Sequence, residues 1–448
     1  MRWRLRGFVR VYHASQWLRA RFTPAGRAVL GLLAAGAVLG VDTRRTAAFE
    51  LFAITTALLV IAWLSSLRRR APALALERET PQLATLGEPF ACRYRLRCLG
   101  GRALTGLRLR DELAEAFPSA AEFAHRRGAD DEPMNWVDRS IGYPRWLALL
   151  RRRRGVDLNE LALPALAPGA SHELSVTLTP RRRGTLRFER GRVLWPDPLG
   201  LVNSVTDREL PGEVLVLPRL YPVPALTLPG VRRFQRGGVS QSLAVGESQE
   251  FVQLRDYRPG DPLRHIHWPS FARRGEPVVK EFQDEYFTRY ALVLDTFGLD
   301  ATTDADPACF EAAVSVAASF ASALNTREAL LDLLFVEDRA YRLTAGRGVG
   351  QSIELLRVLA AVEPAPRADF ALLAEYVLAQ AAGLSACVSV LLSFDPARRA
   401  LIERLRQRGV RQLVLVIGSD VSAARVPGVH WIDPRDVAGA LRAAMTPC

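Results

Sequence analysis

Tyr290-Ala-Leu-Val-Leu-Asp-Thr-Phe-Gly-Leu299 opens the part of this 448-residue chain in which apolar runs alternate with helical patterns. Further apolar runs lie at 329–336, 386–392 and 412–417, and helical stretches lie at 310–324, 352–362, 370–382, 396–408 and 434–445. Such alternation predicts βαβ units and a parallel sheet. The runs are apolar almost throughout, as expected where helices cover both faces of a sheet. We therefore expect an α/β domain over 289–448.

The sequence upstream has the two-residue period of half-buried strands. Phe90-Ala-Cys-Arg-Tyr-Arg-Leu-Arg-Cys98 and His172-Glu-Leu-Ser-Val-Thr-Leu-Thr179 each place apolar side chains on one face. We expect a β-rich, immunoglobulin-like sandwich over 76–218, because two sheets packed together bury such faces. The segment 111–155 shows little periodicity, and we expect a polar, mobile insertion there.

Two apolar stretches near the amino terminus predict a membrane anchor. Residues 28–41 and 51–67 contain no charged side chain, and the second stretch ends at Arg68-Arg69-Arg70. A basic end of this kind is typical of a helix that stops at an anionic leaflet. We therefore predict a two-helix transmembrane hairpin over 22–70. A cleaved signal peptide and a soluble pair of helices are the alternatives.

Arginine placement predicts the orientation of this hairpin. The basic amino-terminal segment 1–21 holds six arginines, whereas the loop between the apolar stretches balances its arginines with Asp42 and Glu50. Positive charge concentrates on the cytoplasmic side of membrane proteins. We therefore expect a multi-pass protein of the bacterial inner membrane, in contact with the lipid bilayer, whose folded domains face the cytoplasm.

The formal net charge of +13 comes almost wholly from arginine, because Lys280 is the only lysine. Its basic runs are scattered along the chain and belong to no nucleic-acid-binding motif, so we expect no nucleic-acid partner. The five cysteines form no C-x-x-C pair and fit buried thiols in a reducing compartment.

The most specific motif lies between the two folded regions. It reads Gly246-Glu-Ser-Gln-Glu-Phe-Val-Gln-Leu-Arg-Asp-Tyr-Arg-Pro-Gly-Asp-Pro-Leu-Arg-His-Ile-His-Trp268, followed by Ser270-Phe-Ala-Arg273. This run closely resembles the signature of the domain-of-unknown-function 58 family, roughly E-F-x-x-L-R-x-Y-x-x-G-D-x-x-R-x-I-[DH]-W-x-x-x-A-R. The positions that match are Glu250, Phe251, Leu254, Arg255, Tyr257, Gly260, Asp261, Arg264, Ile266, His267, Trp268, Ala272 and Arg273.

The resemblance implies two membrane helices, a β-rich module and a von Willebrand factor A-like α/β domain, with the family signature segment over 231–288. It also implies a partner, because members are similar in occurrence to accessory proteins of MoxR-type AAA+ ATPases. The family has no established biochemical activity. The resemblance therefore implies a role in envelope functions or complex assembly, without naming a reaction.

Two interpretations of the signature's charged residues stay open. A carboxylate and guanidinium network could tie the segment onto the α/β domain, around a tight turn at Pro259-Gly260-Asp261. The other interpretation is a docking face, since arginine and aromatic side chains dominate interface hot spots. The residues expected to form the network or bind the partner are Glu250, Arg255, Tyr257, Gly260, Asp261, Arg264, His267, Trp268 and Arg273.

The first strand of the α/β domain ends where the resembled folds hold Mg²⁺ through D-x-S-x-S. Here Phe297 and Leu299 replace both serines and offer no ligand atom. Asp295, and Asp395 at the end of a later strand, remain as a degenerate metal site. We therefore expect magnesium binding to be weak or absent, and no other cofactor.

The alternative is a metal-dependent enzyme that uses Asp261, His265 and His267, because the two histidines share a face if the stretch is a strand. No H-E-x-x-H or G-x-S-x-G motif occurs, and the sole lysine does not belong to a Walker A loop. Gly346-Arg-Gly-Val-Gly350 has the spacing of a glycine-rich turn. We therefore expect a non-enzymatic membrane scaffold that recruits a cytoplasmic partner.

Overall fold

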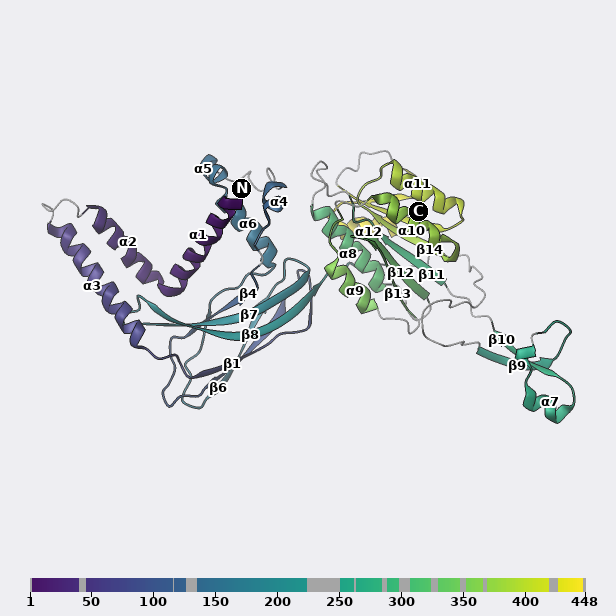
Figure 1. Cartoon of the computed structure of the whole chain (residues 1–448), viewed down its shortest axis with the longest axis horizontal. Coiled ribbons are helices and arrows are strands. Elements are labelled where there is room, and N and C mark those ends of the chain that lie inside the picture. The colour runs from purple at the N-terminus through teal and green to yellow at the C-terminus, as the bar shows by residue number, and fades with distance from the viewer. Residues whose placement is uncertain are drawn as a thin grey trace. The chain divides into compact units, whose positions relative to one another are not determined.

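The computed structural model forms two compact units, residues 1–219 and 220–448 (Figure 1). Each unit has its own hydrophobic cores. The residues that the structure describes are 2–39, 46–115, 117–125, 135–223, 250–261, 263–283, 288–297, 307–323, 329–346, 352–365, 369–418 and 426–445.

The first unit is built around two sheets that share one core. The antiparallel three-stranded sheet has the order β1 (Leu74–Glu79), β3 (Phe90–Cys98), β6 (Ser171–Leu178). The five-stranded sheet has the order β2 (Leu83–Thr85), β8 (Asn203–Leu217), β7 (Gly184–Pro196), β4 (Arg108–Leu113), β5 (Leu161–Ala162). The strand predicted over 90–98 is confirmed, and its side chains alternate between buried and exposed as the two-residue period requires.

The expectation of a mobile insertion over 111–155 is wrong for most of its described residues. The segment contains part of β4 and three helices, α4 (Ala120–His125), α5 (Trp136–Ile141) and α6 (Tyr143–Arg154). Trp146, Leu149 and Leu150 of α6 are fully buried, although four arginines close the same helix. The apolar side chains are few and large, so they form a core with a weak sequence pattern.

Three helices precede these sheets. The amino-terminal segment, expected only to be basic, forms α1 (Arg2–Arg21). The apolar stretches form α2 (Pro24–Leu39) and α3 (Thr46–Arg68), which lie side by side (Figure 1).

Among the described residues, α3 alone is long and apolar enough to cross a membrane. Its Ala47–Arg68 portion has a mean hydropathy of 2.1. The apolar helix α2 has 16 residues, which at 1.5 Å per residue cover about 24 Å of a hydrocarbon core about 30 Å thick. One candidate span therefore supports membrane association, and the second predicted span stays a prediction.

The second unit contains a six-stranded sheet in the order β13 (Ala340–Ala345), β12 (Ala329–Val336), β11 (Thr288–Leu294), β14 (Ala386–Leu391), β15 (Arg411–Ile417), β16 (Val429–Ile432). All neighbouring pairs are parallel except β12 and β13. Its helices are α8 (Pro307–Ala323), α9 (Ser352–Ala361), α10 (Phe370–Gln380), α11 (Pro396–Gln407) and α12 (Val437–Met445). A short 3₁₀ turn, η2 (Ala381–Gly383), follows α10.

The strand β11 lies between β12 and β14. From β11 the chain first continues to β12 on one side, and it later returns to place β14 on the other side. The strand order therefore reverses at β11, and ligands of open α/β sheets bind beyond the carboxyl ends of strands at such a switch point. Asp295 follows β11 directly, and Leu392 follows β14. The topology thus brings the predicted degenerate metal site to this edge of the sheet.

The signature segment forms a separate two-stranded sheet within the second unit. Strand β9 (Glu250–Asp256) pairs antiparallel with β10 (Val278–Gln283). Between them lie a tight turn, the 3₁₀ turn η1 (Leu263–His265) and the short helix α7 (Trp268–Arg274) (Figure 1).

Candidate functional site

The turn after β9 is held by an ion pair between two signature residues. Both terminal nitrogens of Arg255 donate to the carboxylate of Asp261, each at 2.7 Å. The backbone N–H of Arg258 donates to the same carboxylate at 2.8 Å. Gly260 has a φ of 108°, a conformation that favours glycine. These contacts close the predicted turn.

The Asp261 carboxyl is strongly acidic in this setting. The hydrogen bonds from Arg255, followed by the Arg258 amide, lower the pKa of Asp261 from its usual value to about 2. The carboxylate is therefore ionised at every physiological pH. Its oxygens are engaged by arginine and backbone donors, which leaves a poor ligand set for a metal ion.

A second set of contacts fixes the start of α7. The backbone N–H of His267 donates to Val278 O in β10 at 2.8 Å, and Nδ1 of His267 lies 2.7 Å from the hydroxyl of Ser270. Helix α7 ends at Gly275, whose φ of 74° is typical of a helix carboxyl-terminal glycine. The segment between β9 and β10 is therefore a folded unit supported from both strands.

These supports leave arginine and apolar side chains exposed on the segment. The side chains of Leu263 and Trp268 are 67% and 60% exposed. Arg264 and Arg273 are also exposed, and the Trp268 ring packs edge-on against Phe271 at 5.9 Å. We call Leu263, Arg264, Trp268 and Arg273 the signature surface.

The histidines of the metal hypothesis do not lie on one strand. His265 ends η1, and His267 immediately precedes α7. Within the part of the chain that the structure describes, no group of three His, Cys, Asp or Glu side chains could hold a metal ion. Glu250 starts β9 opposite Gln283, and Tyr257 donates its backbone N–H to Pro277 O at 3.0 Å.

The edge of the α/β sheet holds a buried carboxylate with an internal cation. Asp295 is fully buried, and its carboxylate accepts from Arg398 Nε at 2.6 Å and from Arg398 Nη2 at 3.1 Å. The backbone N–H groups of Phe297 and Leu392 donate to it at 3.0 Å each. Burial raises the pKa of Asp295, while Arg398 and these amides act in the opposite direction.

The same arginine joins the second predicted acid. Asp395 precedes α11 and accepts from the Arg398 backbone N–H at 2.9 Å, as an N-cap does. The Nη1 group of Arg398 donates to the other Asp395 oxygen. One guanidinium thus bridges Asp295 and Asp395, the two residues of the degenerate metal site.

Aromatic rings support this arginine. The Arg398 guanidinium lies 4.5 Å from the centroid of the Phe370 ring, and Phe370 packs edge-on against Phe297 at 5.8 Å. Phe297, which stands where a serine would supply a metal ligand, therefore packs against the ring that contacts the Arg398 guanidinium. Leu299, the other replaced serine position, lies outside the described residues.

Sequence reasoning missed Arg398. The motif Asp395-Pro-Ala-Arg398 could have suggested it, because the fourth residue of an N-capped turn lies next to the capping carboxylate. Its pairing with Asp295, 103 residues away, has no local signal.

Comparison with known proteins agrees with the family signature. Residues 253–440 match the family described as "Protein of unknown function DUF58". The match covers most of the signature segment and most of the α/β domain, and it confirms the resemblance for this part of the chain. The remainder of the chain lies outside that match.

The "Uncharacterized protein YeaD" of Bacillus subtilis (strain 168) is 32% identical to this chain over 151 residues. The alignment covers 33% of this chain and 35% of that relative, so the chain spans about a third of the relative's length.

Two solved structures of the CARDB domain of the PF1109 protein from Pyrococcus furiosus are also similar. One is 12% identical and covers 33% of this chain and 97% of that domain, with a TM-score of 0.18. The other, in complex with di-metal ions, is 13% identical and covers 33% of this chain and 89% of that domain, also with a TM-score of 0.18.

Proposed function

We propose that this chain is a non-enzymatic membrane scaffold whose signature surface binds a cytoplasmic protein partner, a MoxR-type AAA+ ATPase. The observation that carries this proposal is the exposure of Trp268 on the same folded segment as the exposed Arg264 and Arg273. The alternative metal-dependent enzyme gains no support from Asp261, because Arg255 and Arg258 engage its carboxylate.

Rigidity supports a binding role for the signature surface. The Arg255–Asp261 pair and the β9–β10 ladder fix the backbone from which Leu263, Arg264 and Trp268 project. A surface ordered before binding loses less conformational entropy on association. Tryptophan and arginine supply large contact areas and bidentate hydrogen bonds, and they are enriched among residues that dominate binding energy.

The α/β domain supports recognition without a shared metal ion. We propose that it is a von Willebrand factor A-like domain in which the Arg398 guanidinium replaces the bound cation. Asp295 and Asp395 already have a positive charge between them. A carboxylate of the partner could therefore not bind here as a ligand of a metal ion. Binding would depend instead on shape complementarity and on ion pairs.

The apolar helices support attachment to a membrane. We propose that α2 and α3 together form the transmembrane hairpin, with α3 as the complete span. Exposed arginines end α3 at Arg68 and follow it at Arg69 and Arg70, a pattern typical of the cytoplasmic end of a span. Both folded units would then face the cytoplasm.

Quantitative binding tests the proposal. Full-length protein in lipid nanodiscs is titrated with a purified MoxR-type ATPase from the same organism, and association is followed by interferometry. Trp268→Ala and Arg264→Glu are each expected to weaken binding at least tenfold, the loss expected when a hot-spot side chain is removed. Arg404→Glu, at an exposed position of α11, is the matched control and is expected to bind normally.

Two results would contradict the proposal. The first is that the ATPase does not bind full-length protein at all. The second is that it binds all three variants as tightly as the unaltered chain. A stoichiometric metal in the purified protein that is lost in His267→Ala would favour the enzyme alternative instead.

A further inference from the structure

Helix α1 has two distinct stripes of side chains. The inner stripe consists of Leu5, Phe8, Val9, Tyr12, Gln16 and Ala20, and the outer stripe consists of Trp3, Arg6, Arg10, Ala14, Trp17 and Arg21. Successive residues of each stripe are three or four positions apart, except for the adjacent Phe8 and Val9, so each stripe follows one side of the helix. The two stripes face different surroundings.

The inner stripe packs against the helical insertion. Tyr12 is buried in a core with Trp146, and their rings meet at 5.8 Å. Phe8 packs edge-on against Tyr143 at 5.6 Å. These contacts account for the apolar residues on this side of α1, and they explain why a helix rich in arginine is folded against the module.

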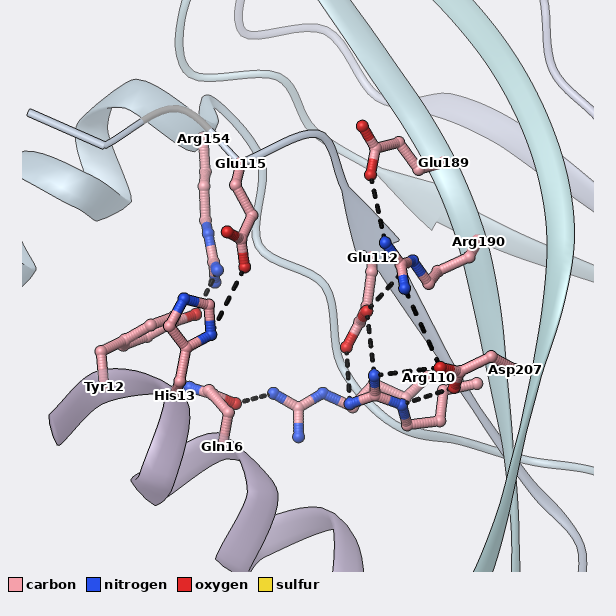
Figure 2. Close-up of polar contacts among 11 residues, drawn as sticks. Tyr12, His13, Gln16, Arg110, Glu112, Glu115, Arg154, Glu189, Arg190 and Asp207 are labelled. Carbon is pink, nitrogen blue, oxygen red and sulfur yellow. Dashed lines mark hydrogen bonds and ion pairs between the residues drawn. The ribbon is translucent and has the colours of Figure 1, made fainter. Parts of the chain in front are cut away.

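Polar contacts extend the same attachment (Figure 2). The hydroxyl of Tyr12 accepts from Arg154 of α6, and the Gln16 side chain accepts from Arg110 of β4. His13 lies 3.7 Å from Glu115. Since these contacts reach both α6 and the residues in and after β4, the module fixes the rotation of α1 about its own axis.

The carboxyl end of α1 is fixed as well. The turn between β7 and β8 is organised by Asp197, whose carboxylate accepts from the Leu201 backbone N–H at 2.7 Å. Leu201 O accepts from the Thr23 backbone N–H at 3.1 Å, and the Asn203 side chain donates to Ala20 O at 3.0 Å. The junction of α1 and α2 therefore docks on the sandwich, and the two helices diverge from it as the arms of a V (Figure 1).

The outer stripe is exposed from Trp3 to Trp17 and contains no negative charge. Trp3 and Trp17 near its ends are 84% and 50% exposed, and Arg6, Arg10 and Ala14 between them are also exposed. Helix α1 contains no acidic residue anywhere. Two large aromatic rings flanking guanidinium groups are costly to leave in water, so this side of α1 has the composition of a contact surface.

We propose that the outer stripe of α1 lies flat on the surface of an anionic lipid bilayer, an inference that rests on the proposed membrane anchor. Tryptophan is enriched at the level of the headgroups, and arginine is attracted to the surface of an anionic leaflet. Charge and aromatic content together fit a helix that lies in the interface.

Continuity with the apolar helices favours lipid over a protein partner. Only Phe22 and Thr23 separate α1 from α2, so α1 ends where the apolar pair begins. The Arg21 guanidinium lies 6.0 Å from the centroid of the Trp63 ring of α3. Exposed arginines stand in the first turn of α2, at Arg27, and at the carboxyl end of α3, at 68–70. A bilayer crossed by α2 and α3 would place its headgroups beside these arginines and against the outer stripe of α1. Helix α1 would then hold the folded module in one fixed orientation on the membrane.

Site-directed spin labelling of the full chain tests the inference. A nitroxide at Ala14→Cys reports the outer stripe, one at Ile61→Cys reports α3, and one at Glu88→Cys, in the turn before β3, is the aqueous control. Cys309 and Cys448 are replaced by serine, and buried thiols stay unlabelled. The protein is reconstituted into phosphatidylcholine vesicles that contain phosphatidylglycerol, and collisions with oxygen and with a water-soluble nickel chelate are compared.

The inference predicts that the Ala14 label collides more with oxygen and less with nickel than the Glu88 label. Arg6→Glu with Arg10→Glu is expected to move the Ala14 values toward the aqueous control, with the melting temperature unchanged because both side chains are exposed.

An aqueous Ala14 label beside a lipid-exposed Ile61 label overturns this inference and leaves the anchor intact. An aqueous Ile61 label overturns both. An Ala14 label that is aqueous in vesicles, and immobilised only when membrane proteins are added, would assign the stripe to a protein and also overturn it.

Discussion

Arg398 and Asp295 form a bidentate ion pair at the carboxyl end of β11, with Nε to Oδ2 at 2.6 Å and Nη2 to Oδ1 at 3.1 Å. The side chain of Asp295 is fully buried and that of Arg398 nearly so. The pair places a fixed positive charge between two carboxylates that would otherwise repel each other. The candidate metal site of the sequence therefore already holds a cation of the protein itself, the Arg398 guanidinium.

Removal of the arginine should destabilise the α/β domain. Arg398→Ala leaves a buried carboxylate without its counter-ion, a change that typically costs about 3–5 kcal/mol. Chemical unfolding of the full chain, followed by far-ultraviolet circular dichroism, should show that loss in the transition of this domain. The double variant Asp295→Asn with Arg398→Met is the control, and it should recover part of the stability because neither partner then carries a charge. Equal stability of Arg398→Ala and the unaltered chain would contradict the structural role.

Magnesium and manganese should not bind at this edge. Any divalent ion would have to displace the Arg398 guanidinium, which makes three hydrogen bonds to Asp295 and Asp395. The Arg398 backbone N–H donates a fourth, to Asp395. Isothermal titration of the full chain should give heats of dilution alone. A stoichiometric signal that disappears in Asp295→Ala would show that the site opens for a cation.

A glycine in α2 gives an unusual stability prediction. Glycine to alanine inside a helix normally stabilises by up to about 1 kcal/mol. At Gly26 an added Cβ would lie 1.9 Å from Leu201 O, so Gly26→Ala should instead lower the melting temperature of the first unit. Gly31→Ala, in the same helix, is the matched control, because a Cβ added at Gly31 would have no heavy atom within 4 Å. This variant should not lower the melting temperature. Similar melting temperatures for the two variants would refute the docking of α2 on the β7–β8 turn.

The turn of the signature segment should be insensitive to pH above the range in which Asp261 titrates. Its pKa is lowered to about 2, so the ionised form that pairs with Arg255 persists as pH falls and is lost only when pH approaches that value. Partner affinity should therefore be constant with respect to this group between about pH 5 and pH 8.

Loss of that ion pair should weaken partner binding. Asp261→Asn removes the charge that Arg255 engages, and we expect roughly tenfold weaker association because the turn must then be ordered on binding. Asp256→Asn, at an exposed neighbouring position, is the control and should bind as the unaltered chain does. An Asp261→Asn variant with full affinity would show that the ion pair does not organise the signature surface.

Strong, uniform patterns made parts of the fold predictable. The apolar run at 329–336 coincides with β12, and the alternation at 90–98 coincides with β3. Strands β13 and β16 were missed, because β13 mixes polar and apolar residues and β16 has four residues. Short strands of this kind form because they pair with a neighbouring strand, and the residues of that neighbour lie elsewhere in the sequence.

Long-range pairing explains what else the sequence could not reveal. The residues of the signature turn were predictable because Arg255 and Asp261 are six positions apart. The cation between Asp295 and Asp395 was not, because the pair of Arg398 with Asp295 depends on the meeting of β11 and β14. Helix α1 was read only as a basic segment, since its apolar stripe is interrupted by arginines that belong to its other side.

The central claim is that the signature surface contacts a MoxR-type ATPase on the membrane, and photo-crosslinking in intact cells tests it most directly. Benzoylphenylalanine is placed at Leu263 on that surface and, as the control, at the exposed Leu372 of α10. The proposed function predicts an ultraviolet-dependent adduct from position 263 that mass spectrometry identifies as the ATPase, and no such adduct from position 372. Expression of both variants in the membrane without any ATPase adduct at position 263 would contradict the claim.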